Sequence, residues 1–223
     1  MATIGTTRDA RALGGVASER DTGQLLGQVM AFVAVTAGFA ALGAYLGRDL
    51  SGVTGLVLFI AAFACVFGLH FAAAKGREQL AIGLLFGLGL LLGLAVAPVI
   101  ADFAEADPSA LWQAAGATAA FVAAFGAYGY ATRRDLSSWG RTLFWALLGL
   151  IVFGIVSIFV SIPSSNIIYA VAGLVVFGAF TIFDFNRLRG ASADGAALIA
   201  ASIFLDIFNV FLLLLDLFGG QRN

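Results

Sequence analysis

Cysteine is almost absent from this chain. A single cysteine, Cys65, among 223 residues excludes a disulfide framework, a CxxC redox pair and a zinc site built from several thiolates. Charged residues make up only 11%, and a net charge of −1 gives no sign of a surface for nucleic acid. The sequence also lacks HExxH and GxSxG motifs and has one histidine, so we expect neither an enzyme nor a bound cofactor.

Hydrophobic residues, by contrast, make up 61% of the chain, and the mean hydropathy is +1.00. Soluble domains contain about 25% charged residues, more than twice the share found here. Residues 53–74 and 82–100 are apolar on every face, whereas strands of a membrane β-barrel alternate between apolar and polar residues. The composition therefore predicts an all-α integral membrane protein embedded in a lipid bilayer.

Long apolar runs separated by charged residues, Gly, Pro or Asn predict seven transmembrane helices. They fall at residues 24–46, 52–74, 79–101, 110–131, 142–162, 166–187 and 196–218. The connections are short, at most about ten residues, which makes most neighbouring helices antiparallel and leaves no linker between domains. We therefore expect one seven-helix transmembrane domain over residues 24–219, with tails at 1–23 and 220–223.

Lysine and arginine are divided unequally between the two sides of these helices. With the N-terminus in the cytoplasm, ten basic residues lie on the cytoplasmic side, and only Arg48 and Arg222 lie on the other. The ten are Arg8, Arg11, Arg20, Lys75, Arg77, Arg133, Arg134, Arg141, Arg187 and Arg189. Residues 1–23 carry charge but no apolar core, which is typical of a cytoplasmic tail. Seven crossings place the C-terminus outside. If the last helix entered and returned instead, Arg222 would lie inside and the count of basic residues would be eleven against one. The distribution of charge therefore leaves both topologies open.

Glycine and proline mark the third predicted helix. Gly83, Gly87, Gly89 and Gly93 form two small-xxx-small repeats, which let helix backbones approach closely in membranes. No GxxxxGK or GxGxxG pattern is present, so packing is expected rather than phosphate binding. Pro98 near the outer end of this helix is expected to bend it.

Few ionisable residues lie inside the predicted helices, and Asp206 is the deepest of them. A charge at the bilayer centre costs several kcal/mol, so such residues usually face the bundle interior or a water-filled path. Asp206 lies about 16 Å from the start of the last helix, near mid-membrane. Ser202 and Asn209 share its helical face, so this polar stripe should face inward. The stripe indicates either an ion or proton role or an interhelical hydrogen-bond clamp through a protonated carboxyl.

Four further ionisable residues lie nearer the ends of the helices. Asp184 is near the cytoplasmic end of the sixth helix, with Thr181 and Arg187 three residues away on the same face, so a functional carboxylate and an intrahelical ion pair are both open. His70, in the second helix, is either a hydrogen-bonded neutral imidazole or a pH switch, because histidine titrates near neutral pH. Asp216, near the outer interface, is expected to be solvated.

Four segments in order resemble the motifs of the Bax inhibitor-1 family, also called the transmembrane Bax inhibitor motif family, in its bacterial branch. They are LGLAVAPVIADF at 92–103, ATRRDLSSWG at 131–140, VFGAFTIFDFNRL at 176–188 and IFLDIFNVFLLLLDLFGG at 203–220. The resemblance covers most of the chain. It implies a seven-helix bundle of the bacterial inner membrane with the last helix near its centre.

The resemblance also implies a function: a proton-sensitive calcium leak in which two aspartates of the last two helices share a proton. By motif position these are Asp184 and Asp206, whose carboxylates would also bind calcium transiently. Two carboxylates at hydrogen-bond distance in a low dielectric cannot both ionise cheaply, so such a pair titrates as one unit. Calcium ions and protons are the partners that this function predicts.

The sequence departs from the family in one respect. In the family's bacterial leak an arginine of the second helix engages the sixth-helix aspartate, but residues 53–74 contain no arginine. His70 or Arg187 could serve as this latch, or the latch is absent. Another branch of the family resembles inhibitors of a membrane-bound AAA protease. A non-conducting regulator of such a protease, or of a stress or cell-death partner, is therefore the alternative function, although Asp184 and Asp206 favour the leak.

Overall fold

A computed structural model describes residues 5–50, 52–160 and 164–219 of the chain. Over these residues the chain folds into seven α-helices and one 3₁₀ turn, without a strand. The elements are α1 (Gly5–Leu46), α2 (Gly52–Ala74), α3 (Glu78–Ala106), α4 (Pro108–Ala131), α5 (Trp139–Phe159), α6 (Ser165–Leu188), η1 (Ala193–Gly195) and α7 (Ala196–Gly219). Each helix contains a segment long and apolar enough to cross a membrane. The prediction of an all-α bundle with seven membrane-spanning helices is confirmed.

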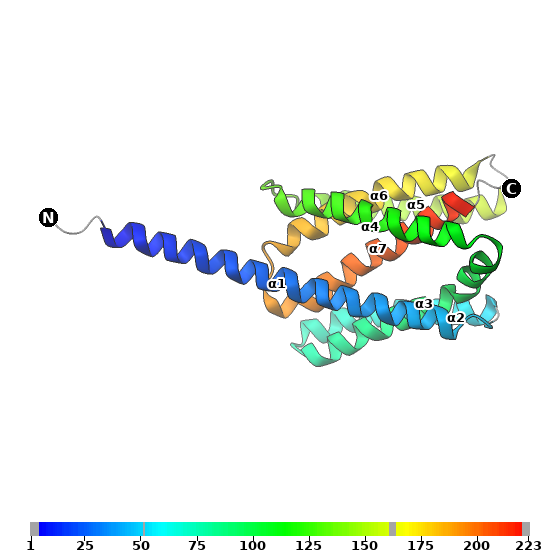
Figure 1. The fold of residues 1–223 in the computed structure, drawn as a ribbon, viewed down its shortest axis with the longest axis horizontal. Helices are drawn as coiled ribbons and strands as arrows, with labels where there is room; N and C mark the ends of the chain where they lie inside the picture. The colour runs from blue at the N-terminus through cyan, green and yellow to red at the C-terminus, as the bar shows by residue number, and fades with distance from the viewer. Residues whose placement is uncertain (1–4, 51, 161–163, 220–223) are drawn as a thin grey trace.

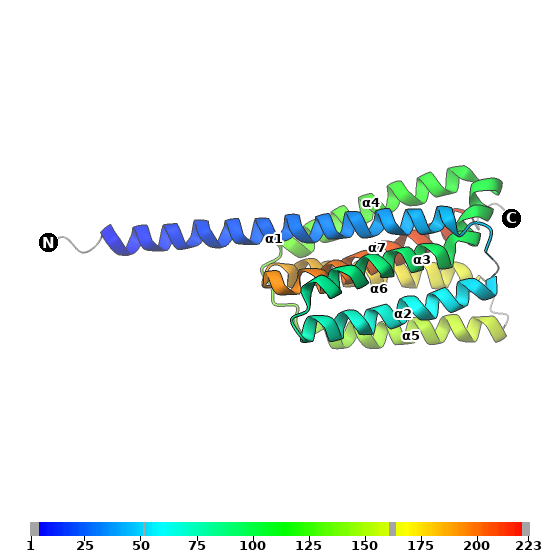
Figure 2. The ribbon, with the colours of Figure 1, turned by 90° about the horizontal axis from the view of Figure 1, so that it is seen from below.

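The helices run back and forth along one axis, and α7 runs the full length of the bundle (Figures 1 and 2). It is one continuous helix of 24 residues, about 36 Å long at 1.5 Å per residue. The last apolar run therefore does not enter and return. The loops with Lys75 and Arg133 lie at the end of the bundle from which α1 projects, and Arg48 lies at the opposite end. That the first of these ends faces the cytoplasm stays a prediction.

The last helix occupies the centre of the bundle. It packs against α1, α2, α3, α4 and α6, and in Figure 1 it crosses obliquely between the other helices. In the apolar segment of α7, 61% of the residues are buried, against 11–39% in the other six. The central position expected for the last helix is confirmed.

Among the membrane-spanning segments, the largest boundary error falls on the third helix. Its predicted end was residue 101, but α3 continues to Ala106, and α4 begins two residues later with Pro108 at its first turn. Proline suits that position because the first helical N–H groups have no intrahelical partner. Pro98 lies inside α3, and the last turns of α3 bend towards α4 in Figure 1. The expected bend is therefore present.

The sequence predicted that both glycine repeats of α3 serve helix packing, but only one of them does. Gly89 and Gly93 are buried against α1, where an added methyl group would overlap the backbone of Thr36 and of Ala40. Around Gly83 and Gly87 the space for such a group is open. One repeat therefore forms the contact between α1 and α3, and the prediction was wrong for the other.

Most of the predicted N-terminal tail is helical. The structure begins α1 at Gly5, so residues 5–23 continue the first helix instead of forming a separate segment. The segment of α1 able to cross a membrane is Gly23–Leu46, one residue longer than predicted. The predicted C-terminal tail at 220–223 lies outside the described residues.

Candidate functional site

The two aspartates singled out by the sequence are both buried between helices. Asp184 in α6 is 4% exposed and Asp206 in α7 is 5% exposed. Among the described residues they are the only ionisable side chains in the buried class. Burial of a carboxylate is costly unless it is paired or hydrogen-bonded, so these two positions require a physical reason.

The side chains of Asp184 and Thr181 both lie next to Asp206. Thr181 is fully buried, and its hydroxyl donates to the Phe177 carbonyl oxygen at 2.8 Å. The same hydroxyl lies within reach of Asp206, so its one hydrogen can be donated to the Phe177 carbonyl oxygen or to the carboxylate, but not to both at once. Consistent with this, Oδ2 of Asp206 is buried without a hydrogen-bond partner in the described part of the chain. The structure thus brings together two carboxyl groups and one hydroxyl.

The two aspartates meet although they lie at different distances from the end of their helices. Asp184 is four residues before the end of α6, or about 6 Å, and Asp206 is ten residues after the start of α7, or about 15 Å. The sequence therefore required a stagger between the two helices. Such an offset agrees with the oblique course of α7 between the other helices in Figure 1.

Of the two latch candidates, only Arg187 lies near the pair. Its Nη1 is 4.0 Å from Oδ1 of Asp184, and its side chain is 47% exposed, so the contact is at the limit of an ion pair. His70 is an exposed residue of α2, and its Nδ1 donates to the Val66 carbonyl oxygen at 2.9 Å. Among the described ion pairs none includes His70. In this structure His70 therefore takes no part in a contact with the pair, and a latch at His70 or Arg187 stays a prediction.

The polar stripe of α7 is only partly turned inward. Asp206 is buried, whereas Ser202 and Asn209 are half-buried. The amide of Asn209 donates to the Leu205 carbonyl oxygen at 2.7 Å, within its own helix. Asp216, ten residues after Asp206, is exposed, as its position near the helix end predicted.

Asn186, which the sequence reasoning missed, fastens the end of α4 to α6. Its amide lies 3.2–3.4 Å from the carbonyl oxygens of Gly129, Thr132 and Arg134. Arg189 Nη1 donates to the same Thr132 oxygen at 2.5 Å. The last carbonyls of a helix have no intrahelical donor, so these side chains stand in for one. The signal was present in the polar residues that follow Asp184 in FDFNRL.

The loop from α4 to α5 has its own turn. Oδ1 of Asp135 accepts a hydrogen bond from the backbone N–H of Ser137 at 2.9 Å. This bond lowers the pKa of the Asp135 carboxyl below its ordinary value of 3.8. The basic loop recognised in ATRRDLSSWG is thus a short ordered segment next to Asn186.

The pair offers two residues to a cation, not a full metal cage. Nowhere in the described ranges do three His, Cys, Asp or Glu side chains converge. A resident calcium ion takes six to eight oxygen ligands, of which two carboxyl groups supply at most four. The arrangement suits a carboxyl pair that exchanges a proton or that coordinates a cation transiently.

Comparisons with known proteins give one consistent result. A family model described as "Inhibitor of apoptosis-promoting Bax1" matches residues 22–223. The inner membrane protein YbhL of Escherichia coli K12 is 30% identical over 176 residues, which cover 74% of this chain and 74% of that protein. The Golgi anti-apoptotic protein of vaccinia virus is 34% identical over 164 residues, 72% of this chain and 68% of that protein. A protein of Helicobacter pylori is 29% identical over 164 residues, 73% and 70% of the two chains.

Proposed function

The chain belongs to the Bax inhibitor-1 family of membrane proteins, and from that premise we propose that it is a pH-sensitive calcium leak channel gated by Asp184 and Asp206. The E. coli relative carries the words inner membrane in its name, so we place this chain in a bacterial inner membrane. The basic residues at the α1 end of the bundle favour a cytoplasmic N-terminus.

One observation carries the proposal: two carboxyl groups lie side by side in the bundle interior, and one oxygen of Asp206 has no partner among the described residues. A protein that served only as a scaffold would gain stability from apolar residues at both positions. Intramembrane carboxyl groups of this kind are typical of ion and proton pathways.

The mechanism follows from the charge of the pair. With one shared proton, the two carboxyl groups attract each other and hold α6 against α7. Without it, two like charges in a low dielectric repel each other, and the single hydroxyl hydrogen of Thr181 can stabilise at most one of them. Arg187 is half-exposed and can turn towards the headgroups, so it need not neutralise the second charge. The separated carboxylates then expose oxygen atoms, which calcium prefers as ligands.

Calcium flux into dye-loaded liposomes that contain only the purified protein tests this proposal. We expect flux to rise between about pH 6 and pH 8 and the rise to flatten in Asp184→Asn and in Asp206→Asn, because asparagine keeps the size but cannot titrate. The double variant should add little. Asp216→Asn removes an exposed carboxyl from the same helix and should keep the wild-type profile.

The same experiment separates the alternative function. The vaccinia relative is named an anti-apoptotic protein, which supports a regulator of a stress or cell-death partner, and a membrane-bound AAA protease remains a candidate partner of such a regulator. Absence of flux over the whole pH range would favour this non-conducting regulator. Flux with a pH profile unchanged in both single variants would keep the leak and refute the paired aspartates as its gate.

A further inference from the structure

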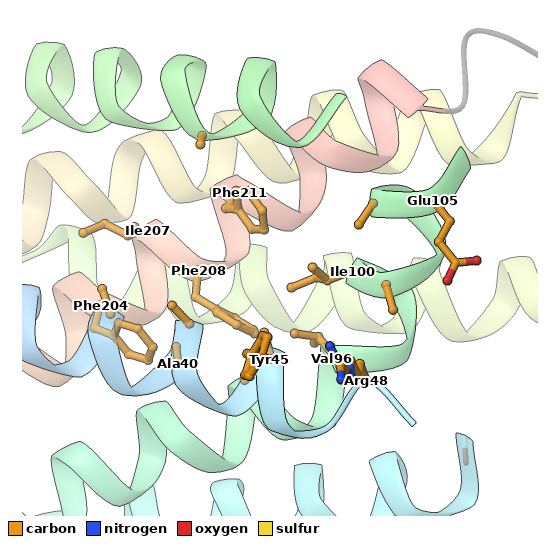
Figure 3. Close-up of a pocket in the computed structure, with 17 residues that line it drawn as sticks. Ala40, Tyr45, Arg48, Val96, Ile100, Glu105, Phe204, Ile207, Phe208 and Phe211 are labelled. Atoms are coloured by element: carbon orange, nitrogen blue, oxygen red, sulfur yellow. The ribbon is translucent and has the colours of Figure 1, made fainter. Parts of the chain in front are cut away.

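An apolar groove lies on the far side of α7 from Asp184. It is a cavity of about 770 Å³ bounded by α1, α3, α4 and α7, and Figure 3 shows its lining. Four side chains of α7 form its floor: Phe204, Ile207, Phe208 and Phe211. Of the 17 lining residues, only Arg48 and Glu105 carry a charge at neutral pH, so the walls are suited to a hydrocarbon ligand.

The groove opens to the side of the bundle between α1 and α4. Three of its lining residues, Ala37 and Ala41 on α1 and Ala115 on α4, are exposed. A second cavity of about 520 Å³ shares Ala115, Ile207 and Phe211 with the first, so the groove continues along α4. For a protein that spans a membrane, this opening faces the acyl chains of the bilayer.

The length of the groove matches one leaflet. Its lining residues on α1 run from Ala37 to Arg48, eleven residues or about 16 Å at 1.5 Å per residue. One leaflet contributes half of a hydrocarbon core about 30 Å thick. An acyl chain that enters from the membrane therefore reaches from the headgroup level to the inner end of this cavity.

Two opposite charges stand at the mouth. The side chain of Arg48 is 57% exposed, and its guanidinium lies over the Tyr45 ring, 5.0 Å from the ring centre. Its ion partner is Asp49 at 3.7 Å, a residue 92% exposed to solvent. Glu105 lines the same mouth from α3 and is exposed (Figure 3). A ligand that fits both charges carries a phosphate for Arg48 and an ammonium group for Glu105.

We propose that this groove binds one acyl chain of a phosphatidylethanolamine molecule from the leaflet at the Arg48 end of the bundle. The phosphate binds Arg48, and the ammonium group donates hydrogen bonds to Glu105. Phosphatidylglycerol offers the phosphate without a cation. Phosphatidylcholine offers a cation without an N–H donor, so the mouth selects against both. The lipid site is separate from the proposed gate, because neither Asp184 nor Asp206 lines the groove. Lipid binding can therefore be tested without measuring calcium flux.

Native mass spectrometry of the purified full-length protein tests the site. The detergent is supplemented with an equal mixture of the three phospholipids, which carry identical acyl chains. We expect retention of one phosphatidylethanolamine, about three- to fivefold over either competitor, since exposed charge pairs contribute at most about 1 kcal/mol. Glu105→Gln should remove the preference over phosphatidylglycerol, and Arg48→Gln should lower retention of all three lipids.

Matched variants separate the groove from general effects on the fold. Asp102→Asn and Arg141→Gln remove exposed charges that do not line the groove, and both should retain lipid like the wild type. Ala41→Phe fills the groove from an exposed position on α1 and should lower retention of every lipid. Val35→Phe places the same ring on the opposite, exposed face of α1, outside both cavities, and should not.

Two results would overturn the proposal. Equal retention of the three lipids, unchanged in Glu105→Gln, would remove the role of the headgroup. Conversion of a dimer to a monomer by Ala41→Phe, without any change in lipid retention, would assign the groove to a second copy of this chain instead.

Discussion

Two helices of this bundle have the same mean hydropathy, but one is mostly exposed at the surface of the bundle and the other is mostly buried inside it. The apolar segments of α5 and α7 both have a mean hydropathy of 2.5, yet 11% of the residues are buried in α5 and 61% in α7. Lipid tails are as apolar as leucine, so hydrophobicity alone does not draw a helix from the bilayer into the bundle. What separates α5 from α7 must lie in the size and polarity of particular side chains.

Small residues and one carboxyl group distinguish α7. Its first turns present alanines that let neighbouring helices approach closely, and Asp206 lies among polar groups that lipid cannot provide. In α5 large apolar side chains point outward instead. Those of Phe144, Trp145, Ile158 and Phe159 are each more than half exposed. The comparison indicates that packing and polar contacts, more than apolar composition, place a helix at the centre.

The same substitution in each helix provides the strongest test of this comparison. Ile203 in α7 is fully buried, and Ile158 in α5 is 78% exposed. We expect Ile203→Ala to lower the free energy of unfolding by about 2 kcal/mol or more, since the cavity removes packing contacts. Ile158→Ala should change it by less than about 0.5 kcal/mol. Reversible unfolding in mixed detergent and SDS micelles measures both. Equal losses would show that burial in the bundle does not control stability.

A pair of glycines in α3 tests the same idea at the level of the backbone. Gly93→Ala forces a methyl group against the backbone of Ala40 and should destabilise the protein by about 1–3 kcal/mol. Gly87→Ala meets open space and should stabilise it by about 0.5–1 kcal/mol, because alanine is the better helix former. The same unfolding assay applies. A loss in Gly87→Ala as large as in Gly93→Ala would contradict the assignment of only one repeat to packing.

Much of this architecture was predictable, and the exceptions have identifiable causes. Helix number and most helix ends follow from apolar runs, which need no knowledge of neighbours, whereas the start of α1 and the end of α3 extend into charged residues. The pairing of Asp184 and Asp206 was predicted only through the family resemblance, because no local pattern fixes the offset between two helices. The exposure of His70 was not predictable, because its depth in the sequence does not fix which side of α2 faces the bundle. Asn186 escaped notice because its acceptors lie more than fifty residues away.

The two ends of α6 each carry an asparagine, one in contact with α4 and one exposed, and this difference gives a third prediction. Asn186 joins the last carbonyls of α4, whereas Asn166 at the other end of the same helix is exposed. Asn186→Ala should lower the free energy of unfolding by about 1 kcal/mol, the usual net contribution of a hydrogen bond. It should also speed amide exchange in the loop around residue 132. Asn166→Ala is the matched control. Faster exchange in both variants would refute a specific clamp.

The smallest effect is expected at Asp135, which lies outside the helices altogether. Its pKa is lowered by the hydrogen bond from the Ser137 backbone, so its contribution to stability is present above the ordinary value of 3.8 and is lost as the pH falls through the lowered value. Asparagine at this position keeps the turn but has no charge to lose. The advantage of the wild type over Asp135→Asn should therefore be slight at neutral pH, shrink as the pH falls below 3.8, and vanish once the pH lies below the lowered pKa and the carboxyl is protonated. Unfolding midpoints of the two proteins, compared across this pH range, measure it. An advantage that grows as the pH falls would contradict the lowered pKa, because only a group whose pKa is raised by folding stabilises more strongly in acid.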